Sequence, residues 1–282
     1  MESGYYLPPI EPELRPEPAP RREPSQRPPW YRHAGGAVAA AALLVAKFAT
    51  KLKLLLVLLP KVKLFTTAGS MLVSIGAYSL LWGWKFALGF VLLLLVHEMG
   101  HVIQLRREGV PASAPLFIPF MGAVVGMKKL PDDAAAEART GLAGPVLGSV
   151  GALGALALYG ATGNELFRAL AFFGFFLNLF NLLPVLPLDG GRAMAALTPW
   201  MWILGYAALV ALAFVFPNPI MLIILFVGGF ELVRRWKERR TPEGRRYYRV
   251  APAARLGIAV VYIGLAAALA FGMQATHLPR TL

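Results

Sequence analysis

Long apolar runs, separated by short polar or turn-forming stretches, fill the chain from about residue 64 to the C-terminus. A helix needs roughly 20 mostly apolar residues to cross a bilayer, and most of these runs approach that length. The pattern predicts an all-α polytopic membrane protein with about six to seven transmembrane helices. The candidate spans are Thr66–Trp84, Phe86–Leu105, Thr140–Tyr159, Leu166–Leu183, Met194–Val215, Ile220–Val233 and Ala254–Met273.

The first 63 residues follow two other patterns. Residues 1–30 contain nine prolines and five glutamates. Proline removes a backbone donor and fixes φ, so residues 1–33 are expected to form a disordered, Pro-rich cytoplasmic tail. Residues 34–63 hold short apolar runs interrupted by five lysines, which are costly inside a span. We interpret them as a basic interfacial segment, with one extra span as the alternative.

Composition agrees with a membrane location, because apolar residues make up 57% of the chain and charged residues only 15%. The net charge of +13 comes from Lys and Arg gathered at the ends of apolar runs. Such charges orient a membrane protein, so we expect a lipid bilayer and no nucleic acid as partner. Residues 234–249 carry eight of the cations and are expected to face the cytoplasm, on the same side as residues 188–192.

A chemically distinctive sequence, His97-Glu98-Met99-Gly100-His101, ends one of these apolar runs. Residues four apart lie on one helix face, so His97 and His101 can reach one metal ion. Glu98 is then placed to act as general base towards a water molecule. The alternative is a buried polar cluster in which the three side chains satisfy one another. Polar groups at membrane depth are expensive and usually mark function, which favours the metal.

A catalytic zinc ion takes three protein ligands and a water, so a third ligand is needed. The chain has no cysteine. Most other acids fall in the tail, in basic loops or on the opposite side, and Asp132, Asp133 and Glu137 are expected in a polar loop. Asp189 is the acid that remains.

The segment before Asp189 favours an irregular backbone at this point. Pro184 and Pro187 each remove a helical hydrogen bond, and Gly190 and Gly191 allow backbone shapes that other residues resist. Irregular backbone at membrane depth is tolerated where it is buried or lines a watery cavity. A helix broken here can turn the carboxylate inwards, although an ordinary helix end facing the cytoplasm fits the segment equally well by itself.

Taken together, these motifs resemble the site-2 proteases, which cleave transmembrane segments inside the bilayer. The resemblance implies a zinc ion held by His97, His101 and Asp189. It also implies that Glu98 is the general base and that Asn181 assists the substrate or the developing oxyanion. The matching sequences are His97-Glu98-Met99-Gly100-His101 and Asn181-x-x-Pro184-x-x-x-Leu188-Asp189-Gly190, with weaker matches at 117–123 and 144–148.

The resemblance covers about residues 64–192, which we interpret as the metalloprotease core. Residues 193–282 are expected to add transmembrane helices and the basic cytoplasmic loop 234–249. No PDZ-type domain fits between the motifs. We expect a bacterial plasma membrane because the chain is short and poor in additional domains. The active site is expected towards the cytoplasmic side.

Two glycine-containing segments have structural interpretations. Residues 116–128 mix β-forming residues with Pro119, Gly122 and Gly126, which is typical of a short membrane-associated β-hairpin. Its free edge could hold an unwound substrate strand, and a plain loop is the alternative. The glycines of residues 144–154 predict a smooth helix face for close packing.

The predicted function is therefore intramembrane zinc-dependent hydrolysis of transmembrane-segment substrates, as in regulated intramembrane proteolysis. One alternative is a catalytically inactive, metal-binding scaffold, which has no need for Glu98 between two ligands. A transporter is the other, but it favours inverted repeats and several intramembrane acids, and neither is apparent.

Overall fold

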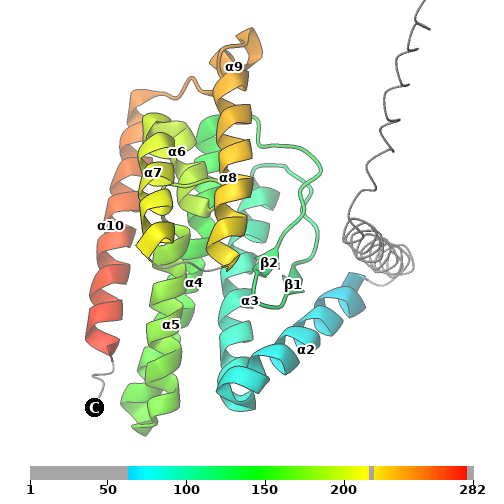
Figure 1. Cartoon of the computed structure of the whole chain (residues 1–282), viewed down its shortest axis with the longest axis vertical. Helices are drawn as coiled ribbons and strands as arrows, with labels where there is room; N and C mark the ends of the chain where they lie inside the picture. The colour runs from blue at the N-terminus through cyan, green and yellow to red at the C-terminus, as the bar shows by residue number, and fades with distance from the viewer. Residues whose placement is uncertain (1–62, 216–218, 278–282) are drawn as a thin grey trace, which may run out of the picture. The chain divides into compact units, whose positions relative to one another are not determined.

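The computed structural model describes residues 63–215 and 219–277 (Figure 1). The predictions for the Pro-rich tail and for nearly all of the basic segment fall in residues 1–62, outside the described residues. The described elements, in chain order, are α2 (Lys63–Trp82), α3 (Trp84–Arg107), β1 (Leu116–Ile118), β2 (Gly122–Val124), α4 (Ala134–Thr162), α5 (Glu165–Asn181), α6 (Asp189–Leu197), α7 (Trp200–Val215), α8 (Pro219–Glu238), α9 (Pro242–Tyr247) and α10 (Pro252–Thr276).

The described part is mostly helical, as the apolar runs predicted. Three of its helices, α3, α4 and α10, are long and apolar enough to cross a membrane, and α7 is a shorter apolar helix. The expected count of six to seven spans is not confirmed. Buried apolar residues of α3, α4 and α5, such as Val91, Ala152 and Phe175, form the core that supports the site.

The predicted single span Met194–Val215 is wrong, because two helices occupy this region. The chain leaves α6 at Leu197, and α7 begins at Trp200. Thr198 between them is extended, with φ −157° and ψ 115°. A proline disfavours helical geometry in the residue before it, and Pro199 follows Thr198 directly. The break is therefore a local consequence of the sequence.

The predicted β-hairpin is present as two antiparallel strands, in which Phe117 lies opposite Ala123. Helix α2 covers the outer edge of β1. The N–H of Phe117 donates to the Ser70 hydroxyl (3.1 Å), and the Thr67 hydroxyl donates to the carbonyl of Pro115 (2.8 Å). The hairpin is thereby fixed against the helix that precedes α3.

Helices α3 and α4 cross at very short range because glycines lie where they meet. A Cβ atom on Gly100 would overlap the carbonyl of Ala143, and one on Gly144 would overlap the imidazole of His101. Small residues at a helix crossing let two backbones approach closely. The close packing expected of residues 144–154 is confirmed at Gly144, where it places α4 directly against a candidate metal ligand, but not at Gly154, where a Cβ atom would meet nothing within 4 Å.

The chain between α5 and α6 is irregular, as Pro184 and Pro187 predicted. Tyr262 of α10 donates to the carbonyl of Leu182 (2.5 Å), and the Trp202 indole of α7 donates to the carbonyl of Gly191 (2.6 Å). These bonds satisfy carbonyl groups near the break, which is how irregular backbone is tolerated away from water.

The two glycines after Asp189 are required because a side chain would not fit at either position. Their backbone conformation is one that other residues can adopt. Neither has a positive φ, and both lie within α6. A Cβ atom on Gly190 would overlap the carbonyl of Leu182, and one on Gly191 would overlap the backbone of Val185. The start of α6 is thus folded tightly against the irregular segment.

The sequence predicts Glu137 in a polar loop, and this prediction is wrong. Glu137 lies in the first turn of α4, with only 3% of its surface exposed. The Arg235 guanidinium of α8 donates to both of its carboxylate oxygens (2.7 and 2.6 Å). The Tyr247 hydroxyl of α9 donates to one of them (2.6 Å). Burial and the neighbouring negative charge of Glu137 raise the pKa of Tyr247, so its hydroxyl remains a donor. This cluster joins α8 and α9 to α4.

Removing the carboxylate with Glu137→Ala is expected to destabilise the protein by about 3–5 kcal/mol, because Arg235 would remain buried without its main partner. Thermal unfolding of the purified chain in detergent measures the change. Glu243→Ala, an exposed acid of α9, is the matched control. Equal melting temperatures for the two variants would contradict a stabilising role for the cluster.

Candidate metal centre and active site

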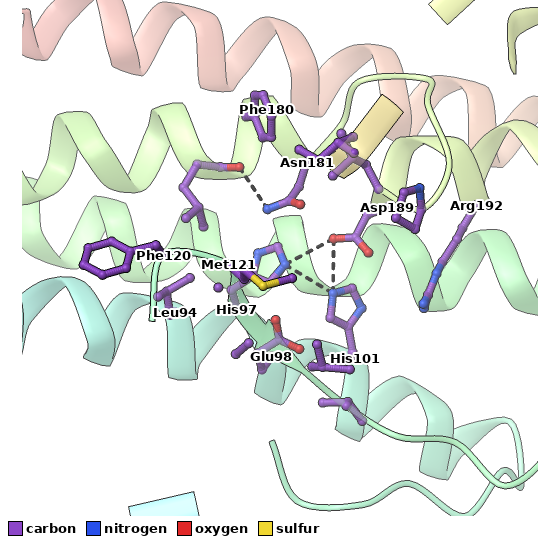
Figure 2. A pocket seen from close by; sticks show the side chains of 18 of the residues that line it. Leu94, His97, Glu98, His101, Phe120, Met121, Phe180, Asn181, Asp189 and Arg192 are labelled. Carbon is purple, nitrogen blue, oxygen red and sulfur yellow. Dashed lines mark hydrogen bonds and ion pairs between the residues drawn. The ribbon is translucent and has the colours of Figure 1, made fainter. Parts of the chain in front are cut away.

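His97 and His101 lie one turn apart on α3 and face the same side, as their spacing predicted (Figure 2). Both side chains are buried, with 2% and 6% of their surfaces exposed. The irregular segment after α5 brings Asp189, at the start of α6, to the same place. The structure therefore unites two motifs that are 88 residues apart along the chain, as counted from His101 to Asp189.

The three side chains converge on one point. Asp189 Oδ2 lies 3.1 Å from His97 Nε2 and 3.2 Å from His101 Nε2. The two Nε2 atoms are 3.2 Å apart. A tetrahedral zinc ion with bonds of about 2.0–2.1 Å holds its ligand atoms about 3.3 Å apart. The observed triangle thus has the dimensions of one face of a zinc coordination tetrahedron.

The hydrogen bonds behind the two imidazoles indicate which atoms face this point. His101 Nδ1 donates to the carbonyl of Thr140 (2.8 Å) and His97 Nδ1 donates to Asn178 Oδ1 (2.7 Å). A carbonyl oxygen only accepts, so each Nδ1 carries the proton of its hydrogen bond and Nε2 is the ring atom left to bind a metal ion. Both Nε2 atoms and the carboxylate of Asp189 face one point, so this set of atoms fits a zinc ion.

Asn178 is a contributor to the site that the sequence analysis missed. Its Nδ2 donates to the carbonyl of Gly174 (2.7 Å), which turns Oδ1 towards His97, and it is 2% exposed. Gly148 of α4 makes room for it, since a Cβ atom there would overlap the amide. The only signal in the sequence was an amide inside an apolar run, three residues before Asn181.

Replacing Asn178 with leucine is expected to weaken zinc binding about 10- to 100-fold, the usual effect of removing a group that orients a metal-binding histidine. Competition for zinc against a fluorescent chelator measures the affinity. Asn181→Leu is the comparison, because Asn181 hydrogen-bonds to the carbonyl of Leu177 and not to any of the three candidate ligands. If both variants keep the affinity of the wild-type chain, Asn178 has no role in orienting His97.

Glu98 is buried on the same helix and lines the cavity that contains the candidate ligands, with 7% of its surface exposed. Figure 2 shows it beside His97 and His101, on the hairpin side of the cluster. It is not a member of the converging triangle. A carboxylate next to a metal site that does not bind the metal is free to accept a proton.

Asn181 lies in the cavity wall near Asp189 (Figure 2). Its Nδ2 donates to the carbonyl of Leu177, one turn earlier (3.1 Å). Its part in binding a substrate stays a prediction. Arg192 of α6 also lines the cavity and adds a positive charge that the sequence analysis did not assign to the site.

The cavity has a volume of about 500 Å³. Apart from the polar cluster its walls are mainly apolar, with contributions from α3, the hairpin, α5 and α8. Phe120 and Met121 of the hairpin turn lie across from Phe180 of α5 (Figure 2). The candidate ligands therefore sit at one side of an apolar pocket large enough for several side chains.

Comparison with known proteins gives matching results. Residues 85–164 match the model of peptidase family M50, and this region contains His97, Glu98 and His101 but ends before Asp189. The chain is 32% identical over 162 residues to zinc metalloprotease MJ0392 of Methanocaldococcus jannaschii, covering 55% of this chain and 45% of that protein. It is 33% identical over 143 residues to putative zinc metalloprotease Rip3 of Mycobacterium tuberculosis, covering 46% of this chain and 35% of that protein.

The chain spans less than half the length of these curated relatives. The relatives are zinc metalloproteases by name, and the described part of this chain combines long apolar helices with the His97–His101–Asp189 cluster. Zinc is thus the metal that the relatives indicate and that the geometry fits. The resemblance to the site-2 protease family, peptidase family M50, is confirmed for the part of the chain that carries His97 and His101.

Proposed function

We propose that this chain is an intramembrane zinc metalloprotease that hydrolyses peptide bonds within or near transmembrane segments, as a step of regulated intramembrane proteolysis. The observation that carries the proposal is the convergence of His97, His101 and Asp189 beside Glu98, in a cavity with apolar walls. His97, His101 and Asp189 would hold zinc, which when bound supplies an acidified water and polarises a carbonyl group.

Within this proposal Glu98 is the group that moves protons. Its carboxylate would take a proton from the attacking water and deliver it to the leaving amine. Asn181, in the opposite wall, would hold the substrate carbonyl or its developing negative charge through its amide. An inactive scaffold, the alternative, has no use for an acid in the position of Glu98.

The hairpin provides a place for an extended substrate. The N–H of Phe117 points outwards from the hairpin to Ser70, so Phe117 and Ala123 form a pair without mutual hydrogen bonds. The N–H and C=O of Ala123 therefore point away from β1, on the side of β2. Residues 121–125 line the cavity. A substrate strand that pairs with this edge would lie beside the metal cluster, with its carbonyl groups freed from helical hydrogen bonds.

The strand-pairing role predicts a selective defect for Ala123→Pro. Proline removes the outward N–H, and a proline is tolerated at a strand edge. Losing one such hydrogen bond is expected to lower kcat/KM about threefold to tenfold while the zinc content stays unchanged. Ala123→Val keeps the donor and is the control. Equal losses in both variants would indicate that shape, rather than main-chain pairing, matters at this position.

We propose further that α2, α5, α7 and α8 lie in the bilayer with α3, α4 and α10. Large apolar side chains on these helices are exposed, including Leu80 (87%), Phe214 (85%) and Phe226 (81%), and lipid would cover them. The basic residues 234–249 begin in the last part of α8 and continue through α9, at the end of the molecule where α6 lies (Figure 1). By the positive-inside rule we propose that the active site faces the cytoplasm, and we propose a bacterial plasma membrane as its location.

The test is cleavage of a single-span reporter protein by the purified chain in detergent. We expect products whose new ends fall within or next to the apolar segment, identified by mass spectrometry. Removing zinc with a chelator should stop the reaction and adding zinc should restore it. A zinc-loaded chain that leaves a panel of single-span reporters intact would contradict the proposed activity.

A further inference from the structure

A second groove, separate from the candidate active site, lies between α3, α4 and α10 and has a volume of about 610 Å³. These are the three helices with the length and composition of membrane spans. Gly100, between the two histidines in the sequence, lines the groove together with Ala143 of α4. The groove therefore lies behind the α3–α4 crossing that supports the candidate metal centre.

The walls of this groove are apolar and partly open to the surroundings. Ile103 of α3, Val146 of α4 and Val261 of α10 line it, with 41%, 43% and 46% of their surfaces exposed. Exposed apolar side chains on membrane-spanning helices are covered by the acyl chains of lipids. The groove is thus suited to an acyl chain along its length.

One end of the groove is basic. Arg107, in the last turn of α3, and Arg139, in the second turn of α4, both line it. Glu108 pairs with Arg139 (2.7 Å), and hydrogen bonds from Arg139 hold the pKa of Glu108 below its ordinary value. In the described part of the chain Arg107 forms no ion pair, so a positive charge at this end is unbalanced. A phosphate group is the complementary ligand.

The distance along α3 between the basic end of the groove and Gly100 fits within one leaflet of a bilayer. Arg107 and Gly100 are seven residues apart on α3, which corresponds to about 10 Å at 1.5 Å per residue. Half of the hydrocarbon core of a bilayer is about 15 Å thick. A headgroup at Arg107 would therefore leave the first part of its acyl chain inside the groove.

We propose that this groove is a binding site for an anionic phospholipid, with its phosphate on Arg107 and Arg139 and one acyl chain between α3, α4 and α10. The volume lies within the range of small-ligand sites, and the charge at one end selects an anionic headgroup over a zwitterionic one. The site would be in the leaflet that faces residues 234–249, the anionic cytoplasmic leaflet in the orientation proposed above.

Two pairs of matched variants test the site. Gly257 lines the groove on α10, and Gly264 lies two turns further along the same helix, outside it; a Cβ atom at either position meets nothing within 4 Å. The first carbon of a side chain at position 257 therefore enters open space, so Gly257→Leu is chosen to fill the groove, and Gly264→Leu is its control. Arg107→Gln removes a positive charge from the basic end of the groove. Arg106→Gln removes the charge of the neighbouring exposed residue, which does not line the groove.

Each full-length variant would be delipidated in detergent, mixed with equal amounts of dioleoylphosphatidylglycerol and dioleoylphosphatidylcholine, and examined by native mass spectrometry. We expect the wild type, Gly264→Leu and Arg106→Gln to retain phosphatidylglycerol preferentially. Arg107→Gln should lose the preference for phosphatidylglycerol, and Gly257→Leu should retain at least tenfold less of either lipid.

Three results would overturn the proposal. Unchanged lipid retention by Gly257→Leu would mean that the retained lipid is spread over the helix surface. Equal effects of Arg106→Gln and Arg107→Gln would mean that general charge, and not this site, selects the headgroup. The chain has no cysteine, so Gly257→Cys introduces one thiol. Efficient cross-linking between two copies through that thiol would show that a second copy occupies the groove.

Discussion

A Glu98→Gln variant is expected to bind zinc as tightly as the wild-type chain and to hydrolyse a single-span reporter at least about 100-fold more slowly. General acid–base catalysis contributes roughly 10²–10⁴-fold, and glutamine keeps the shape of the side chain without its ability to take a proton. Glu98 lines the cavity but is not one of the three converging groups, so its loss should leave the metal in place. Zinc content by elemental analysis and cleavage rate, measured on the same sample, separate the two effects.

Glu108→Gln is the matched control, because Glu108 caps the same helix but pairs with Arg139 outside the cavity. Its cleavage rate should stay close to that of the wild type. Wild-type turnover by a purified, zinc-loaded Glu98→Gln variant would refute the proposed role of Glu98 as the base. That result would not affect the proposed zinc ligands.

The pair of histidines was predictable from the sequence because its geometry is local. Two residues four positions apart share a helix face whatever else the protein does. The break before Asp189 was predictable for a similar reason, since Pro184 and Pro187 act on their own backbone. The convergence of the two motifs followed from needing a third ligand, and the resemblance to a family supported it.

The supporting contacts were not predictable, because they depend on helices that pack from distant parts of the chain. Asn178 orients His97 only because α5 packs against α3. The residues around Asn178 in the sequence do not indicate that its side chain reaches a histidine on another helix. Glu137 was assigned to a polar loop together with Asp132 and Asp133, whereas its burial depends on Arg235, 98 residues away in the chain. Composition suggests where polar groups are costly but not which distant group pairs with them.

Asp189→Ala is expected to abolish both zinc retention and hydrolysis. Catalytic zinc sites use three protein ligands, and Asp189 supplies the single negative charge among the three groups that converge here. Two imidazoles would remain, and their Nε2 atoms, 3.2 Å apart, would still face the cavity but hold the ion far more weakly. Asp189→Asn keeps the size of the side chain and should also lose zinc, which would identify the charge rather than the packing as the cause.

Zinc content after dialysis against a weak chelator measures this loss, and Asp132→Ala, which removes an exposed acid of the loop before α4, is the control. The folded chain should persist in all three variants, because Asp189 also begins a helix whose other contacts are independent of the ion. Stoichiometric zinc in Asp189→Ala with wild-type affinity would mean that the third ligand lies elsewhere. The proposed convergence of the two motifs on one ion would then be wrong, although the helical architecture would stand.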